Sequence, residues 1–504
     1  MFFLNRLLLI VTWIGISLAE PVMAQEEKQS AAIDEIFSRY HQFEHFQGAV
    51  LVAKKGEVFY KKAFGLANRE WNIPNQPDTR FDIASISKQF TAMLVMQLIE
   101  EGKIHPDSSL STYLPEYRQD VGSSVSIHHL LTHTSGIPNY TSIPYVWSDS
   151  LVRRYTSSEL IRKFCSGDLE FAPGTQYSYN NSGYLLLSVV VERVSGKSFE
   201  EVLHERILQP LRMQHSGIDD RSRIIDKRAY GYVREVDGFT NASPMDMANL
   251  QGAGNMYATV EDLYLWDRAL HQQKLLSRRG HLAMNTAYTT ESDTWISPYT
   301  NSYGYGVGLT RLPGMDGKET QMVFHSGHIT GYSSFMARFV EDEHLVVILS
   351  NIGNLSTARM NEIAQEVRNV LNETPHELPE RSMHLLLVKA ALQGGAESAI
   401  EQYYQLKNDF PYEFTETEND LLLAANDLNS NNMDGAALEI LKLNMQVNPG
   451  WKSFFLLGEA YYQQQKYKEA ARLYRKSMRV NPRQSEEEKD AYTASEKALN
   501  MLNQ

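Results

Sequence analysis

The chain has 504 residues, 42% of them hydrophobic, and a formal net charge of -13 at pH 7. This length and hydrophobic content can supply a large core and more than one domain. The acidic balance argues against a nucleic-acid partner, because phosphate binding requires concentrated lysine and arginine. Cys165 is the only cysteine, so an intramolecular disulfide is excluded. We therefore expect stability to come from core burial, with Cys165 a packed thiol rather than a nucleophile.

The first 24 residues have the pattern of a secretory signal peptide. Residues 1–6 carry a positive charge, residues 7–18 form an apolar run, and a small-residue pattern at 22–24 precedes Gln25. The apolar run is too short to span a bilayer comfortably. We predict a cleaved signal peptide at residues 1–24 and a periplasmic or secreted protein. An uncleaved membrane anchor is the alternative.

Apolar, β-branched and aromatic runs predict two strands near each end of a first domain, at residues 48–53, 58–60, 333–340 and 345–349. Helical spacing follows each pair, in residues 85–101 and 357–371. A glycine-rich run at 303–309 reads as a further strand. These patterns predict an α+β domain at residues 30–372, with an antiparallel sheet built from both ends of the domain and a helical, looped insertion between them.

A linker and a helical repeat region are expected after this domain. Residues 373–382 contain two prolines and no apolar period. Residues 383–504 show the spacing of the tetratricopeptide repeat, a helix–turn–helix unit of about 34 residues. The best copy contains Leu457, Gly458, Tyr461, Ala470, Tyr474 and Pro482, and weaker copies contain Ala436, Ile440 and Pro449, and Ala399, Tyr403 and Pro411. We predict an all-α repeat domain that could bind a protein partner. A plain helical bundle is the alternative.

Ser85 and Lys88 are the first candidate catalytic pair. They form an S-x-x-K pattern at the expected start of a helix, where residues three apart share one face. A lysine can take the proton of a neighbouring serine when burial or nearby positive charge depresses the lysine pKa. We predict Ser85 as the nucleophile and Lys88 as its base. Ser87, the nearest rival nucleophile, projects from another helix face and is expected to be structural.

Tyr179 and Asn181 form a second element, Y-x-N, which follows a Pro-Gly turn and precedes an apolar helix. A phenol whose pKa is lowered by a neighbouring lysine can shuttle a proton between nucleophile and leaving group, while an asparagine amide can hold a substrate carbonyl. Tyr299 and Asn301 repeat the pattern without this context. We therefore assign the catalytic role to Tyr179 and a substrate-binding role to Asn181.

The third element is His325-Ser-Gly327, followed by His328 and an expected strand. We predict that His325 and Gly327 take part in substrate binding, together with the backbone N–H of His328. Gly327 is expected to allow close approach of substrate to the strand. The backbone N–H of His328 could form an oxyanion hole with the backbone N–H of Ser85, while the side chain of His328 is expected to be incidental. A copy of the pattern at His215 is rejected, because it lies in a loop after a helix.

The three elements, in this order, resemble the β-lactamase-related serine hydrolases, a family that includes class C β-lactamases, D-alanyl-D-alanine carboxypeptidases, D-aminopeptidases and some esterases. The resemblance covers about residues 35–370 and includes segments 129–137 and 252–263. It implies a bacterial protein with a β-lactamase/transpeptidase-like fold. It also implies acyl transfer through a Ser85 acyl-enzyme, with Lys88 and Tyr179 both taking part in proton transfer. His325 stands where typical class C β-lactamases have lysine, so the resemblance implies weaker β-lactam hydrolysis here.

Two functional interpretations remain open. The first is an active hydrolase that cleaves a small peptide, amide or ester, which could derive from the cell wall. It needs no cofactor or metal: His129 and His133 are four residues apart, but the H-E-x-x-H pattern and a carboxylate ligand are missing. The second is a catalytically silent fold that serves, with its repeats, as a protein-interaction scaffold.

Overall fold

The structure is a computed structural model that describes residues 24–143, 146, 151–289, 302–314, 319–410, 414 and 417–502. The expected signal peptide, apart from its last residue, lies outside the described residues. None of the helices in the described ranges is both long and apolar enough to cross a bilayer. The chain divides into two units, one reaching to Arg234 and continuing over Thr240–Leu378, the other comprising Glu235–Phe239 and Pro379–Gln504. The division after Leu378 falls inside the segment expected to be a linker.

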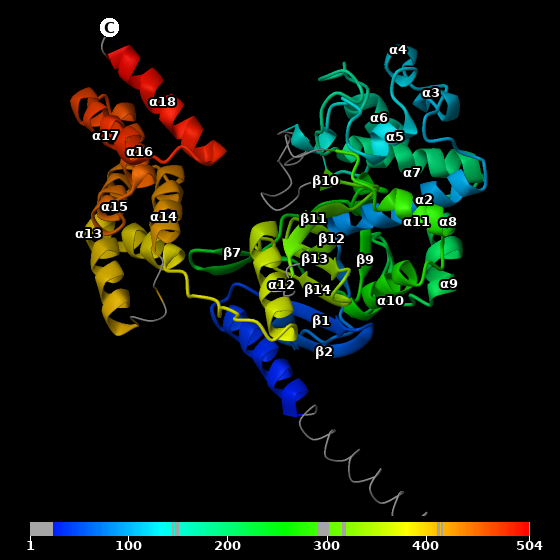
Figure 1. Cartoon of the computed structure of the whole chain (residues 1–504), viewed down its shortest axis with the longest axis horizontal. Helices are drawn as coiled ribbons and strands as arrows, with labels where there is room; N and C mark the ends of the chain where they lie inside the picture. The colour runs from blue at the N-terminus through cyan, green and yellow to red at the C-terminus, as the bar shows by residue number, and fades with distance from the viewer. Residues whose placement is uncertain are drawn as a thin grey trace, which may run out of the picture. The chain divides into compact units, whose positions relative to one another are not determined.

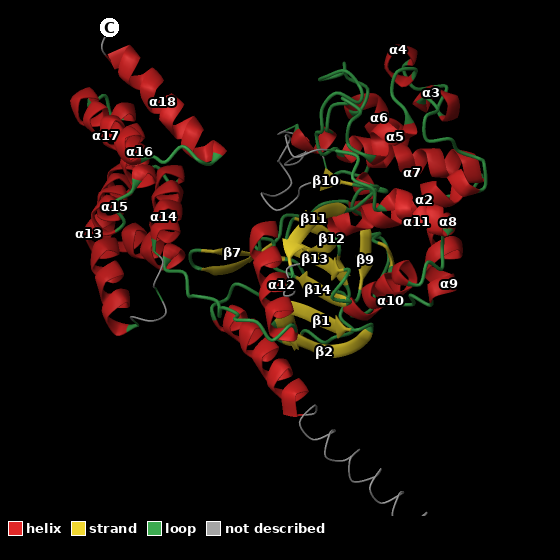
Figure 2. Ribbon diagram, in the orientation of Figure 1, coloured by secondary structure: helices red, strands yellow, loops and turns green. Residues whose placement is uncertain are grey.

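A seven-stranded antiparallel sheet in the first unit has the order β10-β11-β12-β13-β14-β1-β2 (Figure 2). Its strands are β1 (Gly48–Lys54), β2 (Glu57–Phe64), β10 (Ser302–Tyr303), β11 (Gly308–Pro313), β12 (Glu319–Ile329), β13 (Tyr332–Phe339) and β14 (His344–Ser350). The first and last strands of the unit pair with each other, with Gly48 opposite Ser350. The predicted α+β fold, with a sheet built from both ends of the domain, is therefore confirmed.

Strand β1 is apolar and buried from Gly48 to Ala53 because both faces of the sheet are covered. Its residues alternate between two cores: Ala49 and Leu51 face one, and Val50 and Val52 face the other. A helix over residues 24–42 and α12 (Thr357–Leu371) cover the second face. Helices α2 (Ser87–Glu100) and α10 (Val260–His271) cover the first. The nucleophile candidate begins a helix that is thus packed against the centre of the domain.

The insertion between the two pairs of strands is mainly helical. It contains α3 (Leu110–Tyr113), α4 (Gln119–Gly122), α5 (Ile127–Leu131), α6 (Ser157–Phe164), α7 (Asn181–Ser195), α8 (Phe199–Leu203), α9 (Gln209–Leu211) and α11 (Arg278–Met284). Short strands complete it: β3 (Leu66–Asn68), β4 (Ile73–Pro74), β5 (Phe81–Asp82), β6 (Gly217–Ile218), β7 (Tyr232–Glu235), β8 (Gly238–Asn241) and β9 (Met256–Ala258). Pairing of β5 with β9 places the residues just before Ser85 beside the 252–258 segment.

The glycine-rich run at 303–309 is not one strand, contrary to the prediction. Strand β10 ends at Tyr303 and β11 begins at Gly308, and these two residues pair across a tight hairpin. Gly306 has φ +76°, and a Cβ there would lie 2.8 Å from the carbonyl oxygen of Lys88. The glycines therefore mark a turn pressed against α2, a role that the alternation of aromatic residues and glycine concealed.

The second unit contains helices α13 (His384–Asp409), α14 (Glu418–Ser430), α15 (Asp434–Val447), α16 (Trp451–Gln463), α17 (Tyr467–Val480) and α18 (Glu486–Leu502), coloured yellow to red in Figure 1. Helix α13 is broken at Gly394 and Gly395, where the backbone leaves the helical region. In the best repeat copy, a Cβ at Gly458 would meet the ring of Tyr474 at 3.0 Å. This small residue lets α16 and α17 pack closely, as the repeat signature requires.

Candidate active site

Ser85 lies in a 3₁₀ turn (Ala84–Ile86) that leads directly into α2. Ala84 has φ +44°, a left-handed conformation that costs a non-glycine residue free energy and concentrates at functional sites. Ser87 secures this turn: its hydroxyl donates to the carbonyl of Ala84 at 2.6 Å and accepts from the N–H of Met256 at 3.2 Å. Ser87 thus has a structural use, while the Ser85 hydroxyl is held at the entrance to the helix.

Lys88 is fully buried, and its Nζ contacts three oxygen atoms. It lies 2.7 Å from Oδ1 of Asn181, 2.7 Å from the carbonyl oxygen of Ala253 and 3.1 Å from Oγ of Ser85. Burial without a carboxylate lowers the pKa of Lys88 well below its ordinary value of 10.5, as predicted. A neutral amine has two N–H donors and one lone pair. Because Asn181 and Ala253 take the two donors, the lone pair is left for the Ser85 hydroxyl.

Tyr179 lies over the same amine, with Lys88 Nζ 4.8 Å from its ring centre. The expectation that lysine lowers the pKa of Tyr179 is wrong: burial raises it, and only interaction with the Ser85 hydroxyl opposes the rise. Lys88 does not counteract this effect of burial. Asn181 donates from Nδ2 to Thr141 Oγ1 at 2.7 Å while its Oδ1 accepts from Lys88. The two residues of the Y-x-N element therefore both reach the Ser85–Lys88 pair.

His133 supports this arrangement and was not predicted to belong to the site. Its ring lies 4.4 Å from the ring of Tyr179, and its Nδ1 accepts from the backbone N–H of Asn180 at 3.0 Å. Asn180 caps α7 by accepting from the N–H of Gly183 at 2.8 Å. The histidine thus fixes the chain between Tyr179 and Asn181. The only sequence signal was its place in the 129–137 segment, which the family resemblance includes.

Strand β12 presents an open edge to the site. It pairs with β11 only as far as Phe324, whereas its pairing with β13 continues to Ile329. The N–H of Val340 donates to the carbonyl of Gln321, so odd-numbered residues of β12 direct their backbone groups toward β13. The backbone N–H of the even-numbered His328 therefore points to the open edge, the direction that an oxyanion hole requires.

Gly327 is needed for packing within the chain. A Cβ at this position would lie 2.3 Å from the carbonyl oxygen of Ile83 and 3.0 Å from the Cβ of Ala84. The missing side chain lets β12 pack against the turn that carries the nucleophile, and the close approach of a substrate to this glycine stays a prediction. The side chain of His328 points elsewhere, with Nε2 2.9 Å from the carbonyl oxygen of Leu355.

His325 is buried beside Tyr303, a second residue that was not predicted. Its Nε2 lies 2.9 Å from the Tyr303 hydroxyl and its Nδ1 2.6 Å from the carbonyl oxygen of Ser326. Burial is the main cause that lowers the pKa of His325 to about 3, so the ring is neutral. Tyr303 belongs to the glycine-rich run, and nothing in the sequence indicated that its hairpin would turn back to β12.

The described ranges contain no group of three or more His, Cys, Asp or Glu side chains that could hold a metal. His129 and His133 diverge: His129 Nδ1 accepts from the N–H of Ser126 at 3.2 Å, while His133 turns to the site. Cys165 is buried, and burial raises the pKa of its thiol to about 12, which makes it inert at neutral pH.

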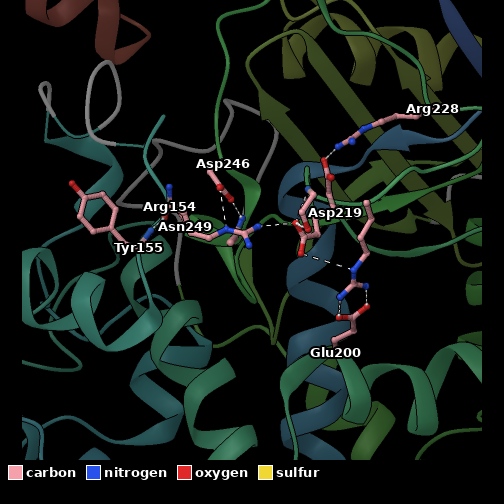
Figure 3. A network of polar contacts seen from close by, with 11 residues as sticks. Arg154, Tyr155, Glu200, Asp219, Arg228, Asp246 and Asn249 are labelled. Atoms are coloured by element: carbon pink, nitrogen blue, oxygen red, sulfur yellow. Dashed lines mark hydrogen bonds and ion pairs between the residues drawn. The ribbon is translucent and has the colours of Figure 1, made fainter.

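Figure 3 shows a network of polar contacts that includes Arg154, Asp219 and Arg228. Arg154 contacts Asp220 at 2.7 Å and Asp246 at 3.0 Å, and so ties the loop before α6 to later segments. At the other end of the network, the buried carboxylate of Asp219 is paired with Arg228, which also lies 4.0 Å from Asp82. Asp82 precedes the nucleophile turn, so this network anchors the chain that delivers Ser85.

Comparisons with known proteins agree with this architecture. Residues 33–368 match the family model described as Beta-lactamase, and residues 451–484 match the one described as Tetratricopeptide repeat. A penicillin-binding protein of Bacillus subtilis is 29% identical over 71% of this chain and 78% of its own length. The crystal structure of a penicillin-binding protein from Bacillus halodurans is 29% identical, with a TM-score of 0.57 over 66% of this chain and 98% of that one.

A D-amino acid amidase from Ochrobactrum anthropi shares the fold, with 23% identity and a TM-score of 0.59 over 69% of this chain and 99% of that one. The family match spans more than half of the chain, so this protein belongs to the Beta-lactamase family of serine hydrolases, whose members include penicillin-binding proteins. It carries in addition a C-terminal tetratricopeptide repeat. The fold class and the family inferred from the sequence motifs are both confirmed.

Proposed function

We propose that this protein is an exported serine hydrolase that cleaves a peptide, amide or ester bond through an acyl-enzyme on Ser85. The observation that carries the proposal is the environment of Lys88. Its two N–H bonds are directed to neutral oxygen acceptors and its lone pair to Ser85 Oγ, 3.1 Å away. A buried neutral lysine in this position is a general base that is ready at neutral pH.

In the proposed reaction the Ser85 hydroxyl proton passes to Lys88 while Oγ attacks the substrate carbonyl carbon. The backbone N–H groups of Ser85 and His328 stabilise the oxyanion. When the bond to the leaving group breaks, the proton returns to that group through Lys88 and Tyr179. Water then attacks the acyl-enzyme by the same proton route and releases the acid. Asn181 positions Lys88 and offers its second amide N–H to the substrate.

The relatives support this reaction class, since they include penicillin-binding proteins, and proteins of the same fold include a D-amino acid amidase and a hydrolase with promiscuous acyltransferase activity. The sequence pattern of residues 1–24 supports export, which would bring cell-wall-derived peptides within reach. The C-terminal repeat supports a role in holding a protein partner.

A fluorophosphonate probe tests the nucleophile directly. We expect covalent labelling of the wild-type protein at Ser85, no labelling of Ser85→Ala, and retained labelling of Ser38→Ala, a control serine on the helix over residues 24–42 whose hydroxyl contacts Asp34. Absence of an adduct on well-folded wild-type protein would refute the proposal and favour the alternative, a silent fold that acts with its repeats as an interaction scaffold.

Turnover of nitrocefin, a D-alanyl dipeptide and a short acyl ester, each compared between wild type and Ser85→Ala, tests the substrate class. We expect the ester or the D-peptide to be hydrolysed faster than the β-lactam, because His325 is neutral where a fixed cation would attract the β-lactam carboxylate. A dominant nitrocefin rate would reverse this ordering.

A further inference from the structure

Both ring nitrogens of His325 are already engaged within the protein. Nδ1 faces the carbonyl oxygen of Ser326 at 2.6 Å, and a carbonyl can only accept, so Nδ1 carries the proton. The unprotonated Nε2 then accepts from the Tyr303 hydroxyl at 2.9 Å. The imidazole therefore has no N–H left for a substrate.

Tyr303 is itself fixed in this position. It is 1% exposed, its ring packs 4.8 Å from that of His133, and strand pairing with Gly308 holds its backbone. The surrounding aromatic rings include those of Tyr177 and Tyr179. A side chain so enclosed cannot swing away to release Nε2 without opening the core around it.

The Tyr303–His325 pair also lacks a cation that could bind a carboxylate, as far as the described residues show. Among the described residues, Lys88 is the basic side chain whose protonated form would act on His325. Lys88 is fully buried, and the same lack of a counter-ion that makes it a base also makes it neutral. A carboxylate brought to this position would lose its water without gaining a cation or an imidazole N–H.

We propose that the Tyr303–His325 pair selects acyl donors whose leaving group is uncharged, namely esters and amides without a carboxylate on the leaving-group side. This inference rests on the proposed function and narrows it. Peptides with a free C-terminal carboxylate next to the cleaved bond are disfavoured. Tyr303 acts as a specificity-determining residue by keeping Nε2 of His325 away from the substrate.

A matched pair of donors tests the inference: N-acetyl-D-alanyl-glycolate and its methyl ester. They share the acyl group and differ in whether the leaving group carries a carboxylate. Release of N-acetyl-D-alanine gives kcat/KM for each. For the wild-type protein we expect the methyl ester to be favoured at least tenfold. Equal or faster cleavage of the carboxylate donor would overturn the inference.

Tyr303→Phe removes the hydroxyl that occupies Nε2 and keeps the ring. We expect it to reduce the preference for the methyl ester at least fivefold, because the imidazole can then take a proton and bind the carboxylate. Tyr305→Phe is the matched control on the same hairpin, since its hydroxyl contacts His128 at 2.8 Å and not His325. It should leave the ratio within twofold. A purely structural defect would lower both rates together, and an unchanged ratio in Tyr303→Phe contradicts the assignment.

Fluorophosphonate labelling of the same samples distinguishes a failure of the specificity role of Tyr303 from a failure of the proposed function. Labelled Ser85 with the wrong order of donors rejects the specificity role and leaves the hydrolase intact. Unlabelled Ser85 in folded protein, with neither donor cleaved, rejects the proposed function and the specificity role with it.

Discussion

Two buried polar clusters flank the nucleophile turn, and each accommodates a buried ionisable side chain in a different way. Lys88 is surrounded by neutral partners and loses its charge, as its lowered pKa shows. The Asp219 carboxylate, with no exposed surface, keeps a counter-ion in Arg228. A buried charge must be paired or neutralised. The comparison teaches that the first solution leaves a reactive base, whereas the second leaves a structural anchor.

The largest effect is expected for Lys88→Met, which removes the base and keeps the length and apolar character of the side chain. Acylation of Ser85 should slow by about 10²–10⁴-fold, the usual contribution of general base catalysis. The protein should remain folded, since no charge is stranded. Burst kinetics with an acyl ester measure the rate and thermal unfolding checks the fold; undiminished acylation would remove Lys88 from the mechanism.

The opposite cluster should respond in stability rather than in chemistry. Arg228→Met leaves the carboxylates of Asp219 and Asp82 buried without this partner. Breaking a buried pair in this way typically costs about 3–5 kcal/mol of the free energy of unfolding. Chemical denaturation measures the loss. Arg223→Met, which breaks the exposed pair with Glu200, is the control and should cost less than about 1 kcal/mol.

Asn181→Asp tests whether the neutral surroundings of Lys88 can be converted into an ion pair of the kind that Asp219 forms with Arg228. An aspartate here would place a carboxylate about as close to Lys88 Nζ as the present amide oxygen, 2.7 Å away. Its charge should raise the lysine pKa by roughly 1–3 units. The base must be deprotonated to act, so the rising limb of the pH profile of kcat/KM should move to higher pH. Below the raised pKa of the lysine, kcat/KM should fall tenfold for each pH unit.

The wild-type enzyme should instead reach its plateau near neutral pH, because burial already lowers the pKa of Lys88. A wild-type rate that still climbs above pH 9, as for an ordinary amine, would contradict the neutral state of Lys88. Measuring kcat/KM between pH 5 and 10 for both proteins separates a shifted pKa from a general loss of activity.

The smallest effect concerns Asp82, whose pKa burial raises from 3.8 to about 6 against the opposing charges of Arg228 and Arg221. The folded state thus binds a proton more tightly than the unfolded chain. Stability from this group is complete below pH 4 and is lost as the pH rises toward 6. Asp82→Asn should therefore be more stable than wild type at pH 8 by roughly 3 kcal/mol, with the advantage vanishing near pH 4.

Denaturation curves at both pH values test this expectation. If Asp82→Asn is less stable than wild type at pH 8, the attraction between Asp82 and Arg228 outweighs the cost of burying the carboxylate, and the two clusters differ more than we infer.

Local patterns were enough to predict the main elements of the fold. Alternation and apolar runs placed the strands at both ends of the sheet, and helical spacing gave residues 357–371, the bounds that α12 has. The tetratricopeptide signature at 457–482 was confirmed as well. These patterns predict the elements correctly because the spacing of apolar residues along the sequence reflects which face of a helix or strand is buried.

The same reasoning was wrong for the run at 303–309, where glycines were read as part of a strand. Period-two alternation is shared by a strand and by a hairpin whose glycines turn the chain. Only the contact of Gly306 with the backbone of α2 distinguishes them. The reason assigned to Gly327 was incomplete in the same way, because its close neighbour proved to be the nucleophile turn.

The sequence by itself determined the family, the order of the three motifs and the identity of the candidate nucleophile and base, because these are matters of residue type and spacing. Only the tertiary structure decided the charge of Lys88, the engagement of both nitrogens of His325 by Ser326 and Tyr303, and the place of His133 behind Tyr179. Protonation and hydrogen bonding depend on what surrounds a group in space, and those neighbours come from segments far apart in the chain.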